Sequence, residues 1–382
     1  MRLPISIHAV FVAGILASSC AGFAQGSAGM LIPTAFARAQ HLRHGVNASI
    51  WFAQSPNDYS AQRTDSYIDA SDFALIAHMG CDNVRLSIDP EPLTRRPQVD
   101  GLNAEFLGRL DKAVDGMIAN GLAVQIDIHP EETYKFRLRE GREGVDRFVE
   151  LWRHLAAHYA SRDPELVFFE VMNEPEVQDA YRWQGILART VAAIREVAPK
   201  NTILAAGGSW DSLQDLLALT PVADGNVIYT FHFYEPYEFT HQGAGWTANY
   251  YRYTHDIPYP TDDAAMAPSL AELQVPADRL ELERYFLDHW DARHIRLLID
   301  TAAEWSNAHH VPIVCNEFGA YRDHVQPAAR AQYIHDVRTA LEADGIGWTM
   351  WDYRANFGVV TRESGTPVPD AAIVTALGLK MP

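Results

Sequence analysis

The segment that decides the fold is Val-Phe-Phe-Glu-Val-Met-Asn-Glu-Pro, residues 167–175. Its first residues are apolar, aromatic or β-branched, which favours a buried strand, and Pro175 cannot extend a sheet. The segment therefore predicts a short parallel strand whose carboxyl end carries Asn173 and Glu174. Taken alone, the three residues Asn-Glu-Pro fit an exposed turn equally well. A functional interpretation needs a second strand that brings another carboxylate to the same place.

A second segment of the same design occurs far away in the chain. Residues 311–321 read Val-Pro-Ile-Val-Cys-Asn-Glu-Phe-Gly-Ala-Tyr, again a short apolar run that ends in an acid, Glu317. Two acids at the carboxyl ends of buried parallel strands are the groups that glycoside hydrolysis uses, one as proton donor and the other as nucleophile or base. Glu174 and Glu317 are therefore the candidate catalytic residues.

Strand-like and helix-like patterns alternate through the rest of the chain. The predicted strands are residues 44–52, 83–89, 122–128, 167–172, 202–206, 226–233, the run that leads to Glu317, and 348–353. The predicted helices are residues 66–79, 106–120, 144–160, 182–197, 212–219, 295–305, 331–341 and 371–377. Eight such units favour an α/β fold of the (β/α)8 type, a TIM barrel, over an open doubly wound sheet. An open sheet would also show a glycine-rich phosphate turn after its first strand, and the sequence has none.

The chain divides into three segments on this basis. Residues 1–24 form a signal segment, residues 25–43 a loose lead-in, and residues 44–382 a single catalytic domain. An insertion at residues 235–288 follows the sixth strand and interrupts the alternation. Because it leaves the catalytic face of the barrel, we expect an extended loop that forms a wall of the binding cleft. Its candidate wall residues are Trp246 and Tyr250, and the alternative is a loop that only contacts solvent.

The first 24 residues have the layout of a secretory signal, with Arg2, a short apolar stretch and then small residues. The apolar stretch is too short for a permanent membrane span. We therefore expect a secreted protein, periplasmic or extracellular, that is cleaved near Gln25. A lipid anchor on Cys20 is the alternative, although the leucine of that pattern, Leu16, stands one position too early.

Charge and cysteine content limit the possible partners. The 382-residue chain has a formal charge of −18 and an isoelectric point near 5.3, so nucleic acid and anionic membrane surfaces would repel it. We expect neither as a partner, apart from membrane contact by the signal segment. Once Cys20 is removed, Cys81 and Cys315 remain, and they fall on non-adjacent strands. We expect two buried thiols and not a disulfide.

Polar and aromatic residues recur at the predicted carboxyl ends of the strands, where barrels of this type carry their sites. In chain order they are Arg85, His129, Asn173, Glu174, Trp210, His232, Tyr234, Glu317 and Trp351. Each alone also fits a structural role, such as a buried ion pair for Arg85 or a satisfied core histidine for His129. Their common placement favours a functional site.

These residues resemble glycoside hydrolase family 5, the cellulase family of clan A, over essentially the whole chain after the signal. The most specific matches are Asn173-Glu174-Pro175 and Glu317-Phe318-Gly319. The supporting matches are Asn83-Val84-Arg85, the histidine of Asp127-Ile128-His129, His232-Phe233-Tyr234 and Trp351. The chain departs from the common pattern at Pro130, which follows His129, and in the first strand, which lacks an asparagine-tryptophan turn.

The resemblance implies a role for each matched residue. Glu174 would be the general acid/base and Glu317 the nucleophile. Arg85 and Tyr234 would hold Glu317, and Asn173 would bond the 2-hydroxyl group of the reacting sugar. His129 and His232 would line the site of that sugar, and Trp351 would be its stacking floor.

Elementary chemistry agrees with these roles. A nucleophile must be ionised, which a guanidinium such as Arg85 favours by its charge, whereas the acid Glu174 needs a proton and is helped by burial. Pyranose rings present apolar C–H faces that stack on indole rings, so Trp351, Trp210 and Trp51 suit a sugar cleft.

The leading hypothesis is a secreted, monomeric, retaining endo-β-1,4-glucanase that acts on β-glucan polysaccharide without a cofactor or metal. A β-mannanase and an exo-β-1,3-glucanase remain alternatives, because the same catalytic set serves them. A non-catalytic carbohydrate-binding barrel is a further alternative, but it would not need both acids. A metal hydrolase is disfavoured because His309 and His310 are adjacent and no His-x-His or His-Glu-x-x-His pattern occurs.

Overall fold

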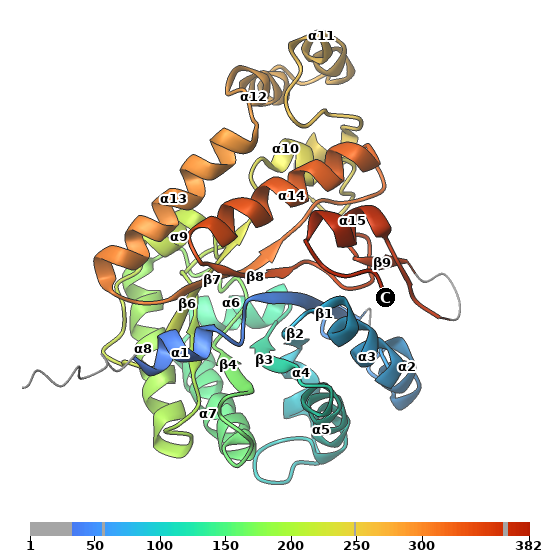
Figure 1. Ribbon diagram of the computed structural model, residues 1–382. Helices are drawn as coiled ribbons and strands as arrows, with labels where there is room; N and C mark the ends of the chain where they lie inside the picture. The colour runs from blue at the N-terminus through green and yellow to red at the C-terminus, as the bar shows by residue number, and fades with distance from the viewer. Residues whose placement is uncertain (1–32, 56–57, 248–249, 362–365) are drawn as a thin grey trace, which may run out of the picture. The chain divides into compact units, whose positions relative to one another are not determined.

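Eight parallel strands close into a barrel in the order of the chain, as predicted (Figure 1). The structure is a computed structural model that describes residues 33–55, 58–247, 250–361 and 366–382, so the expectations for the signal segment and Cys20 lie outside the described residues. The strands are β1 (His44–Phe52), β2 (Asn83–Ile88), β3 (Ala123–Ile128), β4 (Val167–Glu170), β5 (Ile203–Ala205), β6 (Val227–Phe233), β7 (Ile313–Phe318) and β8 (Gly347–Met350). Pairing of β1 with β8 closes the ring.

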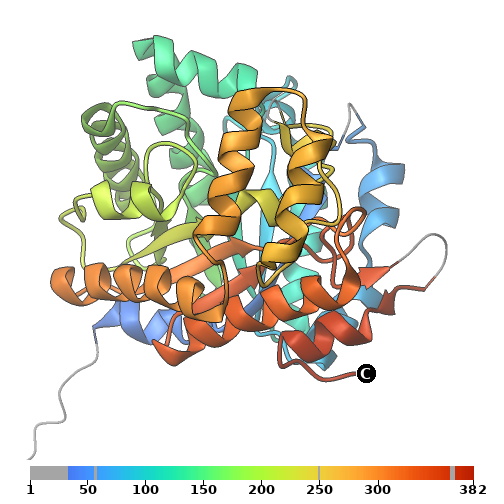
Figure 2. The same ribbon diagram turned by 90° about the horizontal axis from the view of Figure 1, so that it is seen from above.

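Helices surround this barrel (Figure 2). The main ones are α3 (Ala70–Met79), α5 (Ala104–Ala119), α7 (Arg142–Tyr159), α8 (Ala180–Val197), α9 (Leu213–Ala218), α13 (Ala292–His309), α14 (Pro327–Ala343) and α15 (Ala371–Ala376). Helix α7 illustrates the packing, since Phe148, Trp152, Leu155 and Tyr159 recur at helical spacing and are all buried. The closed ring of parallel strands, with helices between successive strands, therefore confirms the predicted TIM barrel.

Buried indole rings hold the strand ends that carry the candidate site. Trp152 Nε1 on α7 donates to the carbonyl of Val171, immediately after β4, at 2.8 Å. Trp183 Nε1 on α8 donates to the carbonyl of Ala206, immediately after β5, also at 2.8 Å. Each bond satisfies a carbonyl that the short strand leaves without a ladder partner. The outer helices thus position the loops on the catalytic face.

The amino-terminal end of the barrel is closed by an apolar layer. It consists of Ala35, Leu42, Ala123, Phe168, Leu204, Ile228 and Val314. Ala35 lies on α1 (Thr34–Ala39), within the segment predicted as a loose lead-in. That prediction was wrong for these residues, because burying Ala35 and Leu42 against the barrel orders the chain before β1.

Other helices also differ from the prediction. The single helix predicted at residues 66–79 is two helices, α2 (Ala61–Tyr67) and α3, because Asp69 caps α3 in a reciprocal pair with Asp72. Two further helices were not predicted, α4 (Pro90–Thr94) after β2 and α6 (Glu132–Glu140) after β3.

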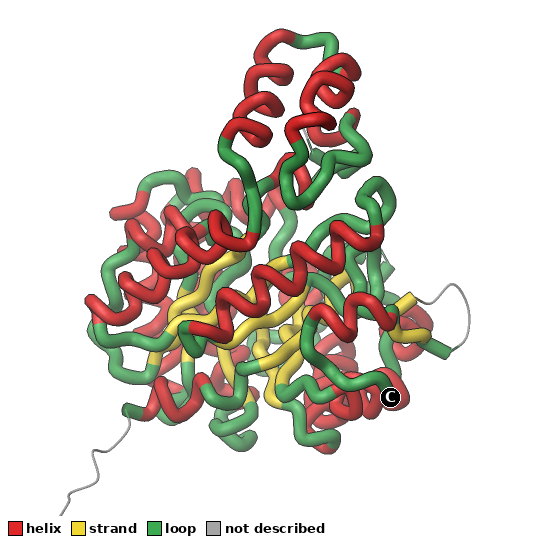
Figure 3. Tube along the Cα trace, turned by 45° about the horizontal axis from the view of Figure 1, so that its top comes forward, coloured by secondary structure: helices red, strands yellow, loops and turns green. Residues whose placement is uncertain are grey.

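The insertion after β6 lies where it was predicted but is largely helical. It contains α10 (Tyr237–Thr240), the 3-10 helix η1 (Tyr250–Tyr253), α11 (Asp263–Glu272) and α12 (Pro276–Leu287). Helices α11 and α12 lie side by side and project from the barrel (Figures 1 and 3). The base of the insertion is anchored by Tyr259, which packs against Tyr333 and donates to Asp336 at 2.9 Å. The description as an extended loop therefore needs correction.

Cys81 and Cys315 are both buried and free, as expected. In the described part of the chain, no helix combines the length and apolar character that crossing a bilayer requires. A two-stranded ribbon, β9 (Val360–Thr361) with β10 (Val368–Pro369), follows the barrel and precedes α15.

Candidate active site

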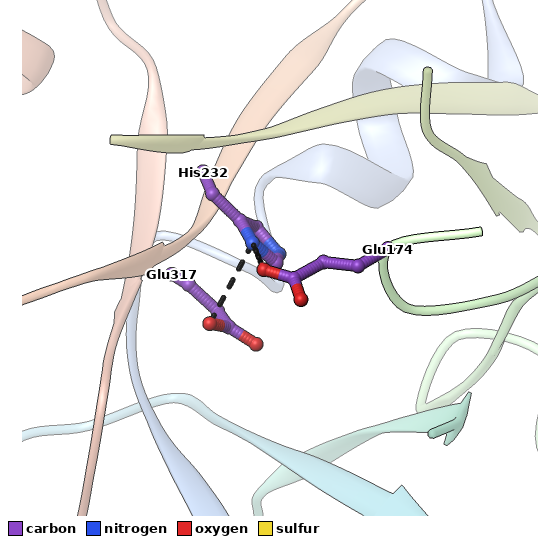
Figure 4. Close-up of side chains that lie close together, drawn as sticks. All are labelled: Glu174, His232 and Glu317. Atoms are coloured by element: carbon purple, nitrogen blue, oxygen red, sulfur yellow. Dashed lines mark hydrogen bonds and ion pairs between the residues drawn. The ribbon is translucent and has the colours of Figure 1, made fainter. Parts of the chain in front are cut away.

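Glu174 and Glu317 face one another with His232 between them (Figure 4). Glu174 lies in the loop after β4, His232 lies on β6 and Glu317 on β7. Nδ1 of His232 is 3.2 Å from Oε1 of Glu174 and 3.6 Å from Oε2 of Glu317. A carboxylate oxygen of Glu174 and one of Glu317 lie within 4.8 Å of each other. Two strands that are far apart in the sequence thus bring their acids to one place, as predicted.

Glu317 is held through both of its oxygens. Nη1 of Arg85 donates to Oε1, and the hydroxyl group of Tyr234 donates to Oε2 at 2.8 Å. Burial raises the pKa of Tyr234 well above its usual value, so this hydroxyl keeps its proton. An ionised carboxylate can accept both bonds, which suits a group that attacks as an anion.

Arg85 is the hub of the buried network around the site. Its side chain is completely buried and contacts Asn47, Asp127, Glu170, Asn173 and Glu317. Burial opposes the guanidinium charge, but the carboxylates of Asp127, Glu170 and Glu317 raise the pKa of Arg85 well above its usual value. Arg85 therefore stays charged and holds its partners in one arrangement.

Three of these partners were not identified from the sequence. Asn47 lies inside the barrel and donates to the carbonyl of Asn316 at 3.0 Å. Asp127 and Glu170 are fully buried on β3 and β4. One sequence signal could have identified Asp127. Side chains alternate between the two faces of a strand, so Asp127 lies on the same face as His129, two residues later.

A chain of hydrogen bonds fixes the orientation of Asn173. Oδ2 of Asp127 is 2.9 Å from Nδ1 of His129, and Nε2 of His129 is 3.2 Å from Nδ2 of Asn173. Burial lowers the pKa of His129 to about 3, so the ring is neutral and Nδ1 carries its proton toward Asp127. Nδ2 of Asn173 then donates to His129, while Oδ1 accepts from Arg85. In the described part of the chain, this bond uses one of the two protons on Nδ2.

The environment of Glu174 suits a proton donor. Its side chain is about a quarter exposed, at 26%, yet burial raises the pKa of its carboxyl group above the usual value. Its backbone has a φ of +39°, which is uncommon outside glycine. Burial also lowers the pKa of His232 to about 4, so the ring beside Glu174 is neutral.

The structure places the three candidate tryptophans in different environments. Trp351 follows β8 and stacks on His129 with ring centroids 5.7 Å apart and an angle of 18° between the planes. Trp210 follows β5 and is 53% exposed beside Lys135. Trp51 is not at the site. The pairing of β1 with β2 is irregular before Phe52, and Trp51 is buried with Nε1 bonded to the carbonyl of Thr64.

The insertion places an exposed aromatic ring, that of Trp246, close to the candidate site. Trp246 is 60% exposed and packs edge-on against Tyr321, with ring centroids 4.8 Å apart, and beside Phe357. Phe357 and Tyr321 share an apolar cluster with Tyr234, which holds Glu317. Tyr250 is different, because it is buried and its hydroxyl group bonds Glu238. The expectation of a wall residue was therefore wrong for Tyr250.

Glu174, His232 and Glu317 have donor atoms close enough together to reach one cation. Arg85 already donates to Glu317, and its positive charge works against a second cation at that oxygen. A cavity of about 760 Å³ lies elsewhere, between α4, α6 and α7, and none of the nine site candidates lines it. The described geometry is therefore that of an acid pair, and the large cavity is separate from it.

Comparisons with known proteins agree with the fold and identify the family. Residues 47–357 match the model of the family described as Cellulase (glycosyl hydrolase family 5). Endoglucanase 3 of Fibrobacter succinogenes is 30% identical over 84% of this chain, and the match spans 51% of that longer protein. Endoglucanase C of Acetivibrio thermocellus is 27% identical over 86% of this chain and 95% of its own length.

A solved structure is similar over nearly its whole length. Cel5A of Thermotoga maritima in complex with cellobiose has a TM-score of 0.71 and 26% identity, and the match covers 90% of this chain and 99% of that one. The same enzyme was also solved with mannotriose. The match to the family model covers most of this chain and includes all nine site candidates. This chain therefore belongs to glycosyl hydrolase family 5, the cellulase family, and is a glycoside hydrolase.

Proposed function

We propose that this protein is a retaining endo-β-1,4-glucanase in which Glu174 is the general acid/base and Glu317 the nucleophile. The observation that carries the proposal is the separation of the two acids, whose nearest carboxylate oxygens lie within 4.8 Å of each other. Retaining glycosidases have carboxyl groups about 5–5.5 Å apart, whereas inverting enzymes need roughly 6.5–9.5 Å to admit a water molecule. The glucanase assignment is supported by the two relatives named endoglucanases.

The reaction follows from the hydrogen bonds of the two acids. Glu317 attacks the anomeric carbon while Glu174 gives its proton to the departing glycosidic oxygen, which leaves a glycosyl ester on Glu317. Glu174, now ionised, takes a proton from a water molecule that attacks the same carbon and releases Glu317. In this scheme Tyr234 and Arg85 hold Glu317 on its line of attack.

The other site residues bind the sugar in this proposal. Asn173 donates its free amide proton to the 2-hydroxyl group, and His129 and His232 line the site of the reacting ring. Trp351 is its stacking floor, because a ring that already stacks on His129 is held in a fixed orientation. Trp210 and Trp246 are exposed, so they are available to stack on sugar units further along the chain.

Substitution of each acid tests these roles. Glu317→Gln should remove nearly all turnover on every substrate, because an amide keeps the shape but cannot attack. Glu174→Gln should lose activity on natural glycosides and keep more of it on aryl glycosides whose leaving group needs no proton. Equal losses of both variants on both substrates would contradict the assignment.

A chelator should leave activity unchanged. Loss of activity with a chelator, followed by recovery when a divalent ion is added, would favour a metal hydrolase.

A β-mannanase is the second candidate, since Cel5A of Thermotoga maritima, 25% identical to this chain, was solved with mannotriose. One reducing-sugar assay should separate the candidates, with carboxymethylcellulose, lichenan, glucomannan, laminarin and xyloglucan as substrates. With mannan added to this set, cleavage of mannan without cleavage of glucans would overturn the glucanase proposal. We also propose that the protein is secreted, which fractionation of expressing cells tests.

A further inference from the structure

Asp211 is a fully buried acid at the candidate site that the proposed reaction does not use. It stands between Trp210 and Ser212 in the loop from β5 to α9, and its φ of +54° is one that aspartate tolerates better than most residues. Ser212 caps α9 in a reciprocal pair with Asp215, so the following turn is well fixed. Asp211 is therefore held in place by its own loop.

The side chain of Asp211 reaches the backbone of the proposed acid. Its Oδ2 accepts the backbone N–H of Glu174 at 2.9 Å. Two residues later, the N–H of Glu176 donates to the carbonyl of Ser209, also at 2.9 Å. The loop after β4 is thus tied to the loop after β5 at two points, and one of them is at Glu174, whose backbone has a positive φ.

Asp211 also faces the histidine that lies between the two acids. Its Oδ2 is 3.7 Å from Nε2 of His232, and its carbonyl accepts the backbone N–H of His232 at 2.6 Å. The other ring nitrogen of His232 contacts Glu174 and lies near Glu317. Asp211 therefore contacts both Glu174 and His232.

Burial favours the neutral form of Asp211, and it outweighs the N–H of Glu174 and the charge of Arg85, which favour the ionised form. The groups that act on it are Glu174, Glu170 and Arg85, together with His232, and Arg85 is already paired with three carboxylates. In the described part of the chain, neither Oδ1 of Asp211 nor Nε2 of His232 has a hydrogen-bond partner. Burial and the two neighbouring glutamates raise the pKa of Asp211 well above its usual value.

We propose that Asp211 is a positioning residue that fixes the backbone of Glu174 and the ring of His232, so that the proton of Glu174 is aimed at the departing oxygen. It works as a neutral acid and adds no negative charge beside Glu174. This inference rests on the proposed function, because it assumes that Glu174 is the proton donor. It extends that function to a residue that never touches the substrate.

The test compares two substrates that differ only in their need for a proton. Phenyl β-cellobioside has a poor leaving group and 2,4-dinitrophenyl β-cellobioside a good one, and kcat/KM reports the step in which the glycosidic bond breaks. We define the ratio as kcat/KM for the dinitrophenyl substrate divided by kcat/KM for the phenyl substrate. This ratio does not depend on how much of the enzyme is folded. A loss of stability alone therefore leaves the ratio unchanged.

Asp211→Ala should lower kcat/KM for the phenyl substrate by roughly 10- to 100-fold, because a misplaced acid loses most of its effect. The dinitrophenyl substrate should lose much less, so the ratio should rise. Asp211→Asn should keep the ratio of the unmodified protein, since the amide is neutral and still accepts the N–H of Glu174. Ser212→Ala is the matched control, because it removes an uncharged side chain that caps α9 in the same loop and that bonds Asp215. It should lower both values by the same factor.

An unchanged ratio in Asp211→Ala would reduce Asp211 to a structural residue and overturn the proposal. If the ratio in Asp211→Asn is as high as that in Asp211→Ala, the claim that Asp211 works in its neutral form is wrong. Glu174→Gln separates these failures from failure of the proposed function. If Glu174→Gln raises the ratio and Asp211→Ala does not, only the present inference fails. If Glu174→Gln leaves the ratio unchanged, the assignment of the acid itself is wrong.

Discussion

Arg85 and Glu170 form a two-pronged ion pair inside the barrel, with Nε 2.8 Å from Oε2 and Nη2 2.7 Å from Oε1. Both side chains are completely inaccessible to solvent. This pairing sets the plane of the guanidinium, and it turns Nη1 toward Glu317. Glu170 on β4 therefore helps to position the proposed nucleophile, Glu317, because it orients Arg85 on β2.

Arg85→Lys should lower kcat by at least about 100-fold, because one ammonium group cannot replace a planar fork that reaches Glu170, Asn173 and Glu317 together. Breaking the buried network should also cost on the order of 3 kcal/mol of unfolding free energy. Kinetics and denaturant unfolding measure the two effects. Arg195→Lys is the control, since Arg195 pairs with Asp224 at a distance from the site. It should reduce stability and leave kcat unchanged, and equal kinetic losses would contradict the role of Arg85.

The strand ends were predictable because a parallel barrel makes two demands at once on the sequence. Each strand needs a short apolar run, and a site on the carboxyl-terminal face needs polar residues where that run stops. Glu174 and Glu317 meet both conditions, and the structure brings them together. Asp127 and Glu170 were missed because a single acid inside an apolar run carries little signal by itself. Its role becomes visible only when the barrel shows that both acids share the inner face with Arg85, which lies on β2, one strand from Asp127 and two strands from Glu170.

Other residues were not predictable for physical reasons that act at longer range. Trp51 follows the pattern of a strand end, but irregular pairing within β1 turns it away from the site. Asp211 lies in a loop after a strand of only three residues, and no local pattern links it to Glu174. The helices of the insertion are fixed at its base by the buried side chains Tyr259 and Tyr285, and such contacts are invisible to local periodicity.

Trp246→Ala should raise KM for long cello-oligosaccharides by roughly 3- to 10-fold, because an exposed ring that stacks on a sugar contributes about 1 kcal/mol. An aryl β-glucoside, which fills only the reacting site, should show no change. Trp246→Phe should recover part of the loss. The control is Tyr181→Ala on α8, where the ring is 93% exposed. A Trp246→Ala variant with unchanged KM for every chain length would leave this ring without a binding role.

The pH dependence should follow the proton of Glu174. Its pKa is raised, so the acid form persists to higher pH, and activity should fall only as pH rises through that raised value. The basic limb of kcat/KM should therefore lie above the usual range of carboxyl groups. Because the two acids are close, the apparent values belong to the pair. In Glu174→Gln, measured on 2,4-dinitrophenyl β-cellobioside, the basic limb should vanish, and a limb that stays in place would belong to another group.

Glu235 should make the fold less stable as pH rises. Burial raises the pKa of this carboxyl group from 4.5 to about 7, so the folded state holds its proton more tightly than the unfolded state. The stabilisation is complete below about pH 4.5 and is lost as pH rises through about 7. Glu235→Gln should reduce the pH dependence of unfolding free energy over that range by on the order of 3 kcal/mol.

The matched control for this prediction is Glu105→Gln on α5, because the side chain of Glu105 is 81% exposed. Denaturant unfolding at several pH values should give this control the slope of the unmodified protein. A Glu235→Gln variant with that same slope would show that Glu235 titrates alike in the folded and unfolded states.

The stereochemistry of the product tests the separation of the two acids directly. A carboxylate oxygen of Glu174 and one of Glu317 lie within 4.8 Å of each other, so under the proposed function we expect Glu317, and not a water molecule, to make the first displacement. Two displacements at the anomeric carbon return the original configuration, and the reducing end should be released as the β-anomer. Proton NMR within the first minutes, before mutarotation mixes the anomers, distinguishes the outcomes. A fresh product that is mainly the α-anomer would require a water molecule as the attacking group, and neither the role of Glu317 nor the double displacement would survive it.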